Sequence, residues 1–122
     1  METVQPIRDK NKIEEIKAIL KRNNTRDYLL FVLGINTGLR ISDILKLKVS
    51  DVKNRTHIEI REEKTNKSKR FFINTCLEKA LNEYLTGMNE NEYLFKSQKG
   101  ANKAIERWQA HKIINNAARQ AG

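Results

Sequence analysis

The chain has 122 residues, of which 39% are hydrophobic and 32% are charged, and this predicts one modest globular domain or part of one. The longest apolar run, residues 28–33, is much shorter than the roughly 20 residues that span a bilayer, and the first residues lack the apolar core of a signal peptide. The single cysteine, Cys76, cannot build a disulfide framework or a metal site alone, and we expect it to be a small buried apolar residue. These features predict a soluble, intracellular protein without a membrane span.

The charge of the chain is strongly positive and unevenly distributed. Lysine and arginine number 24 against 15 acidic residues, a net charge of +9, which suits a polyanionic partner such as nucleic acid. Residues 53–74 carry seven basic and three acidic groups, and residues 96–122 carry six and one, whereas residues 75–95 carry one and four. A folded chain could gather the two basic regions onto one face; the alternative is a generally basic, solvated surface.

Two helices are expected first in chain order. Asp9 is the predicted N-cap of a helix that runs to about Arg22 with one apolar stripe. Thr25 is the predicted N-cap of the second, whose run YLLFVLGI is apolar on every side and therefore predicts a buried central helix. Gly38, in the segment NTGLR, is the expected end of that helix.

The pattern then changes from helix to strand. A short helix, opened by Arg40 or Ser42, is expected to continue to about residue 47. Residues 57–60, HIEI, alternate in polarity as a strand does, and residues 70–73, RFFI, form a plausible partner. The polar residues between them, REEKTNKSK, form the tip of a hairpin or the ends of its strands.

The C-terminal part predicts two further helices separated by a long loop. Thr75 is the expected cap of one helix and Gly87 its end, residues 88–103 are mostly loop, and a last helix is expected from about Ala104 to Ala121. Its expected packing positions are Ile105, Trp108, Ile113, Ile114 and Ala117. The predicted fold class is mainly α with a small antiparallel β-hairpin, and residues 1–122 form a single domain.

Several common chemistries lack their usual motifs. The sequence has no glycine-rich phosphate loop, no HExxH and no CxxC pair, which argues against nucleotide hydrolysis and zinc chemistry. His57 and His111 are isolated in the sequence, and neither predicts a metal site. We therefore expect no metal and no cofactor.

Arg40 and Lys64 are the residues whose setting favours phosphate chemistry. Arg40 directly follows the turn that ends the buried helix, where rigid backbone could present a guanidinium to two phosphate oxygens. Lys64 lies in the exposed segment EEKTNKSKR, where an ammonium could neutralise or protonate a leaving oxygen. Ordinary roles remain open for both: helix capping or ion pairing for Arg40, and hairpin surface for Lys64.

The segments around these residues resemble a known family. Residues 37–52, TGLRISDILKLKVSDV, are similar to the first signature box of tyrosine recombinases of the phage integrase type, and HIEIREEKTNKSKRFFIN resembles the hairpin that carries the family's catalytic lysine. The later segment YLF, its loop and a closing helix that ends in AARQAG follow in the family's order. The resemblance thus covers nearly the whole chain and implies part of a tyrosine-recombinase catalytic domain.

The resemblance implies roles for particular residues. The family breaks DNA with a tyrosine nucleophile through a 3′-phosphotyrosyl link, without metal or cofactor. Arg40 matches the first catalytic arginine, Lys64 matches the hairpin lysine that acts as general acid, and Asp43 matches an acidic residue that supports the active site. Lys67 and Lys69 are alternatives for the acid, because one sequence cannot fix the register of a hairpin. Double-stranded DNA is the implied partner, and its expected contacts are the basic residues Arg61, Lys67, Lys69, Arg70, Lys103 and Arg107.

The family's second box, His-x-x-Arg, and its nucleophilic tyrosine do not occur in these residues. Tyr28, Tyr84 and Tyr93 all precede the place where that box would follow. We therefore expect the N-terminal portion of an integrase catalytic domain, cut before the HxxR box, from a protein that performs site-specific DNA recombination or integration. Whether the segment alone is an enzyme is left open. Self-association during recombination, a cytoplasmic location and a bacterial or phage origin are implied by the resemblance. A noncatalytic DNA-binding module of the same fold and an unrelated basic helical protein are the alternatives.

Overall fold

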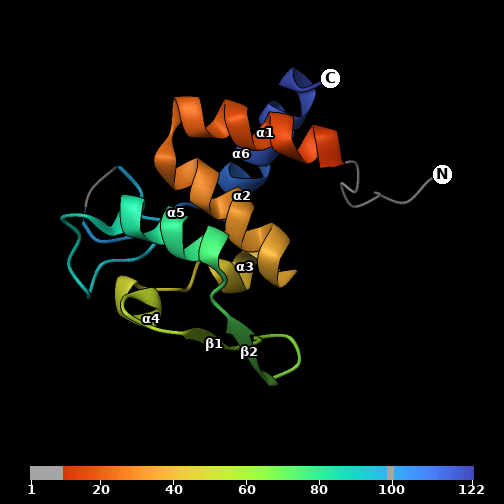
Figure 1. Cartoon of the computed structure of the whole chain (residues 1–122). Helices are drawn as coiled ribbons and strands as arrows, with labels where there is room; N and C mark the ends of the chain where they lie inside the picture. The colour runs from red at the N-terminus through yellow and green to blue at the C-terminus, as the bar shows by residue number, and fades with distance from the viewer. Residues whose placement is uncertain (1–9, 99–100) are drawn as a thin grey trace.

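A computed structural model of the chain describes residues 10–98 and 101–122 (Figure 1). The cap predicted at Asp9 lies outside the described residues. Helices dominate the described part, and one antiparallel hairpin lies below them in Figure 1. In chain order the elements are α1 (Lys10–Asn23), α2 (Thr25–Thr37), α3 (Ile41–Ile44), α4 (Val49–Val52), β1 (His57–Arg61), β2 (Ser68–Phe72), α5 (Thr75–Leu85) and α6 (Arg107–Gln120). This is the predicted class, mainly α with one β-hairpin.

Helix α2 is the centre of the fold, as its all-round apolar sequence predicts. Residues 29–33 are all buried, and α1, α3, α5 and α6 all pack against this helix. Burial of each large apolar side chain stabilises the fold by about 1.5–3 kcal/mol relative to exposure. Gly38 ends α2 as expected: it adopts a left-handed conformation with φ 66°, and its N–H donates to the carbonyl of Gly34. The end of α2 at Gly38 therefore determines where the following residues, including Arg40, leave the core.

The N-caps of α2 and α5 are asparagines, one position before the predicted threonines. The side-chain oxygen of Asn24 accepts hydrogen bonds from the backbone N–H groups of Arg26 and Asp27 in α2. That of Asn74 accepts one from the N–H of Leu77 in α5. Thr25 and Thr75 are instead the first residues inside their helices. Both caps were predicted wrongly because a threonine directly after an asparagine offers the same kind of acceptor, and the backbone dihedral angles decide between them.

The hairpin pairs β1 with β2 in antiparallel register, with Ile58 opposite Phe71 and Arg61 opposite Ser68. Ile58 and Ile60 of β1 are buried, and β2 is largely exposed. The second strand therefore begins two residues before the predicted start and ends one residue before the predicted end. The loop between the strands closes tightly at Asn66, which has a positive φ of 59°.

The segment after α2 is more broken than predicted. The short helix ends at Ile44, and a separate turn of helix, α4, follows from Val49 to Val52. The last helix begins at Arg107 and not at Ala104, because Ala104 pairs with Lys96 in an isolated β-bridge. This pairing between the loop and the preceding segment competes with helix formation, so α6 begins later in the sequence than predicted.

Two expected burial states are wrong. Cys76 is exposed, because it lies in the first turn of α5 at the edge of the buried face that Leu77, Ala80 and Leu81 form. Trp108 was expected to pack in the core, yet 65% of its surface is exposed. It precedes the buried Ala110 by two residues, and a separation of two places side chains on nearly opposite faces of a helix.

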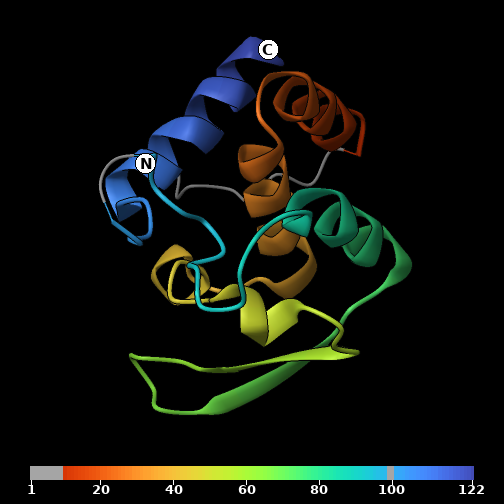
Figure 2. The same ribbon diagram turned by 90° about the vertical axis from the view of Figure 1, so that its left-hand side faces the viewer.

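Figure 2 shows how the charged regions are placed in the fold. The tip of the hairpin and helix α6 lie on the left-hand side of that view, and α5 lies on the right-hand side. The hairpin tip and α6 are thus on the side away from α5, whereas Lys53 and Arg55, at the start of the first basic region, line a hollow together with Glu78 of α5. In the part of the chain that the structure describes, no helix has the length and apolar character to cross a membrane.

Candidate nucleic-acid interface

Arg40 lies between the turn at Gly38 and helix α3, in extended conformation at the N-cap position of that helix. Its side chain makes no capping hydrogen bond. The guanidinium instead points to the hairpin loop, with Nη1 3.6 Å from Oε2 of Glu62, and 47% of the side chain remains exposed. The fold thus brings Arg40, the arginine of the TGLR segment, to the hairpin that carries the basic residues of segment 61–70.

Glu62 joins the two segments and was not singled out by the sequence analysis. It is 6% exposed. Its Oε2 lies 3.5 Å from Nζ of Lys69 as well as near Arg40, and its Oε1 accepts a hydrogen bond of 3.1 Å from Thr65. The sequence contained a signal for the burial of Glu62. Residues 58, 60 and 62 fall on one face of an extended strand, and the first two are isoleucine.

Asp43 links α3 to the hairpin loop. It is 1% exposed, and its Oδ1 accepts a hydrogen bond of 3.2 Å from the backbone N–H of Glu63. The ammonium of Lys46 lies 3.2 Å from the same oxygen and 3.3 Å from the carboxylate of Glu63. Burial alone would lower the pKa of Lys46, but its contacts with Asp43 and Glu63 outweigh that effect and raise the pKa above its ordinary value.

The other basic residues of the hairpin are exposed to solvent. Lys64 lies in the turn at the tip, and Lys67 follows it; neither forms an ion pair with any residue that the structure describes. Arg61 donates to the side-chain oxygen of Asn66 at 3.3 Å, and Arg70 lies 3.8 Å from the carboxylate of Glu59. Of the predicted hairpin contacts, Lys69 is therefore the one that shares a carboxylate oxygen with Arg40.

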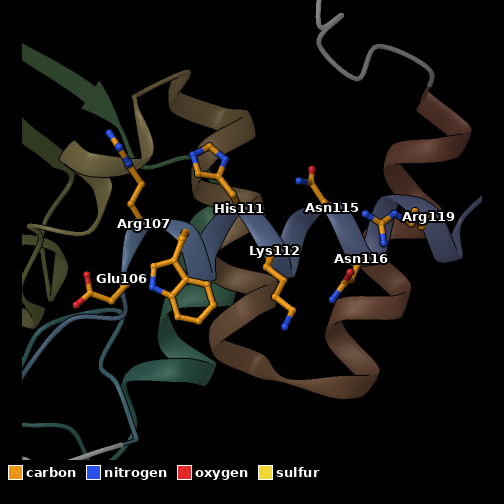
Figure 3. A pocket seen from close by; sticks show the side chains of 8 residues that line it. Glu106, Arg107, His111, Lys112, Asn115, Asn116 and Arg119 are labelled. Carbon is orange, nitrogen blue, oxygen red and sulfur yellow. The ribbon is translucent and has the colours of Figure 1, made fainter.

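Helix α6 carries the second basic region on an open face (Figure 3). The side chains of Arg107, His111 and Asn115 extend from one side of the helix in that view, and those of Lys112 and Asn116 from the other. This face forms a shallow depression lined by Glu106, Arg107, Trp108, His111, Lys112, Asn115, Asn116 and Arg119. Lys103 is exposed and lines an adjoining hollow together with Arg26 and Trp108. The two predicted contacts at this end, Lys103 and Arg107, thus lie close to the exposed tryptophan.

The three tyrosines form contacts within the fold. The hydroxyl of Tyr84 donates a hydrogen bond of 2.6 Å to the carbonyl of Leu94, and burial raises the pKa of Tyr84 to about 12. A phenol that is hard to ionise is a poor nucleophile. Tyr28 packs against the core, and the ring of Tyr93 lies under the ammonium of Lys48, 5.1 Å from the ring centre.

Comparison with known proteins agrees with this geometry. The model of the phage integrase family matches residues 8–122. The chain is 48% identical, over its whole length, to the probable integrase/recombinase YoeC of Bacillus subtilis (strain 168), of which it spans 67%. It is 27% identical over 87% of its length to the tyrosine recombinase XerC of Caldanaerobacter subterraneus subsp. tengcongensis, of which it spans 37%.

Solved structures show the same fold. The crystal structure of XerA recombinase superposes with a TM-score of 0.80 at 23% identity, covering 98% of this chain and 44% of XerA. A lambda integrase structure superposes with a TM-score of 0.75 at 14% identity, covering 100% of this chain and 46% of that one. The chain spans less than half the length of these structures. On this evidence the chain belongs to the phage integrase family, and it has the fold of part of a tyrosine-recombinase catalytic domain.

Proposed function

We propose that this chain is the N-terminal portion of the catalytic domain of a site-specific tyrosine recombinase. The observation that carries the proposal is the meeting of Arg40 and the basic hairpin at one carboxylate, since it joins cations from both signature segments at one place. The names of the relatives support it: YoeC is a probable integrase/recombinase and XerC a tyrosine recombinase. The remainder of the active site, with its nucleophilic tyrosine, belongs to residues outside these 122.

Within this function we assign separate roles to Arg40, Lys64 and Asp43. Arg40 grips two oxygens of the scissile phosphate with its planar guanidinium and stabilises the charge of the transition state. The deprotonated tyrosine oxygen attacks phosphorus to form the 3′-phosphotyrosine, the bond between phosphorus and the 5′ oxygen breaks, and that oxygen leaves with a proton from Lys64. Asp43 holds the hairpin loop in place. The exposed position of Lys64 at the hairpin tip suits this approach to DNA, and Lys67 and Lys69 remain alternatives for the acid.

The test of these roles uses the complete recombinase. Arg40→Lys should reduce the rate of strand cleavage by about 10²–10³ while DNA affinity changes little, because lysine keeps the charge but loses the two-pronged grip. Lys64→Ala should also slow cleavage, and a substrate with a 5′-thiol leaving group should rescue it, since a thiolate needs little protonation. The same substrate should not rescue Arg40→Lys. Equal rescue of both variants, or of neither, contradicts this division of roles.

We propose that duplex DNA lies against the side of the molecule that carries the hairpin tip and α6. The residues expected to contact phosphates are Arg61, Lys67, Lys69, Arg70, Lys103 and Arg107. Each phosphate contact releases counterions, so affinity should fall steeply between about 50 and 200 mM salt. Arg107→Ala should weaken binding and reduce the salt slope by about 1. Lys79→Ala is the matched control, because it removes the same charge from α5. An equal effect of both variants, or binding that ignores salt, refutes this placement of DNA.

We further propose that the complete protein acts as an assembly of copies on DNA in the cytoplasm. Lambda integrase, which shares this fold, has been solved as a tetramer bound to a Holliday junction. Sedimentation of the complete protein with and without its DNA site tests the assembly: copies should associate on DNA, and a strict monomer on DNA contradicts the proposal.

A further inference from the structure

We propose that Glu62 is a positioning residue, whose buried carboxylate holds the guanidinium of Arg40 and the ammonium of Lys69 together where a DNA phosphate binds. The inference rests on the proposed function and adds a residue to its machinery. It starts from an asymmetry of exposure: the side chain of Glu62 is 8% exposed, whereas those of Arg40 and Lys69 are 47% and 49% exposed. The carboxylate therefore lies beneath two cations that still face solvent.

A buried carboxylate is costly unless its oxygens are satisfied. Here Oε1 accepts a hydrogen bond from the Thr65 hydroxyl, and Oε2 faces both cations. The distances to the two cations, 3.6 and 3.5 Å, exceed the roughly 2.7–2.9 Å of a charge-assisted hydrogen bond. Neither cation therefore forms a close hydrogen bond with Glu62, and the N–H donors of both remain available to an oxygen of a ligand.

The backbone fixes the position from which the Glu62 side chain acts. Its N–H donates to the carbonyl of Lys67 at 2.8 Å, and its carbonyl accepts from the N–H of Asn66 at 2.8 Å. The next residue, Glu63, is tied through its N–H to the buried Asp43. Since the backbone at Glu62 and at the next residue is fixed by these hydrogen bonds, the carboxylate has a defined direction and can orient the two cations.

The balance of charge suits one phosphodiester. Arg40, Lys69 and Glu62 together carry one net positive charge, which matches the single negative charge of a bridging DNA phosphate. Without the carboxylate the two cations would repel each other and attract anions more strongly, but with less defined geometry. Loss of Glu62 should therefore separate two quantities that a purely structural defect lowers together: DNA affinity should rise and the rate of cleavage should fall.

The first experiment uses the 122-residue chain and requires no catalysis. The Nη1–H group of Arg40, which faces Glu62 and is observed by NMR, should give a distinct signal in the wild-type chain. Glu62→Gln, which keeps the shape of the side chain, should move this signal to the position of a free arginine, and Glu59→Gln should leave it in place. Glu59 is the matched control, because it is an exposed carboxylate of the same hairpin, paired only at long distance with Arg70. An Arg40 signal that ignores Glu62→Gln overturns the inference.

The second experiment uses the complete recombinase and a short duplex carrying its site. Glu62→Gln should raise DNA affinity about threefold through loss of one negative charge and lower the cleavage rate about 10–100-fold through misplacement of Arg40. Glu59→Gln should raise affinity to a similar or smaller extent and leave cleavage intact. Glu62→Asp keeps the charge but withdraws it from the cations, so cleavage should fall without a gain in affinity.

The outcomes separate this inference from the proposed function. A wild-type recombinase that fails to cleave DNA refutes the proposed function and leaves the NMR result to decide the role of Glu62. A cleaving wild type in which both glutamine variants behave alike refutes the positioning role alone. A fall of affinity and cleavage in parallel with the folded fraction, measured by thermal unfolding, identifies Glu62 as merely structural and also refutes it.

Discussion

Asp43→Ala should lower the free energy of unfolding by about 2–3 kcal/mol, because Asp43 is the buried link between α3 and the hairpin loop. A hydrogen bond from a backbone N–H to a charged acceptor contributes about 1.5–3 kcal/mol, and here that N–H belongs to Glu63. The small cavity left by the carboxylate adds about 1 kcal/mol. Relief of the desolvation cost of a buried charge offsets part of the sum.

The ion pair of Asp43 with Lys46 should contribute little to this loss. Lys46 is 48% exposed and also contacts the exposed carboxylate of Glu63, and such solvent-facing pairs contribute about 0–1 kcal/mol. Lys46→Ala is therefore the matched control and should cost about 0.5 kcal/mol or less. Asp43→Asn should cost less than the alanine change, since the amide oxygen can still accept from Glu63.

Urea unfolding of the three variants measures these differences, with a common m-value as the check that the folded and unfolded states are unchanged. Amide hydrogen exchange provides a local readout: the Glu63 N–H should exchange faster in Asp43→Ala than in Lys46→Ala. A loss under about 1 kcal/mol in Asp43→Ala, or a Lys46→Ala loss equal to it, would refute the reasoning. So would unchanged exchange at Glu63.

Three further predictions concern stability. Tyr84→Phe should cost about 1 kcal/mol at neutral pH through loss of the hydrogen bond to Leu94. Because the folded-state pKa of Tyr84 is raised to about 12, from an ordinary value near 10, that advantage should be complete below pH 10 and shrink as the pH rises toward 12; a difference in stability that stays constant across that range contradicts the assignment. Gly38→Ala should lower stability by about 1 kcal/mol through backbone strain alone, since a Cβ there meets nothing within 4 Å; an unchanged melting temperature refutes it. Phe95→Ala should cost about 3–5 kcal/mol in chemical unfolding, whereas Trp108→Ala, at an exposed site, should cost little, and equal losses would mean that Trp108 packs in the core.

Elements whose signal is local could be predicted from the sequence. An apolar run such as residues 28–33 has no polar face to turn to water, so it predicts a buried helix whatever surrounds it. Gly38 marks the end of that helix because glycine adopts a left-handed conformation at little cost. The alternation of residues 57–60 predicts a strand, and the segment TGLRISDILKLKVSDV indicates the family. The mainly helical fold with one hairpin follows from these signals.

Burial and contacts between distant segments were decided by the tertiary structure. Residue type alone predicted that Cys76 is buried, and helical spacing, which shows which residues share a face but not which face meets a neighbour, predicted the same of Trp108; both predictions were wrong. Periodicity could place Glu62 on the inner face of its strand, but only packing brings it to Arg40, 22 positions earlier in the chain. Only packing, too, shows that Lys69 is the hairpin lysine whose ammonium lies near the Glu62 carboxylate. A side chain's partners depend on the path of the whole backbone, and the charge pattern of one segment carries no information about that path.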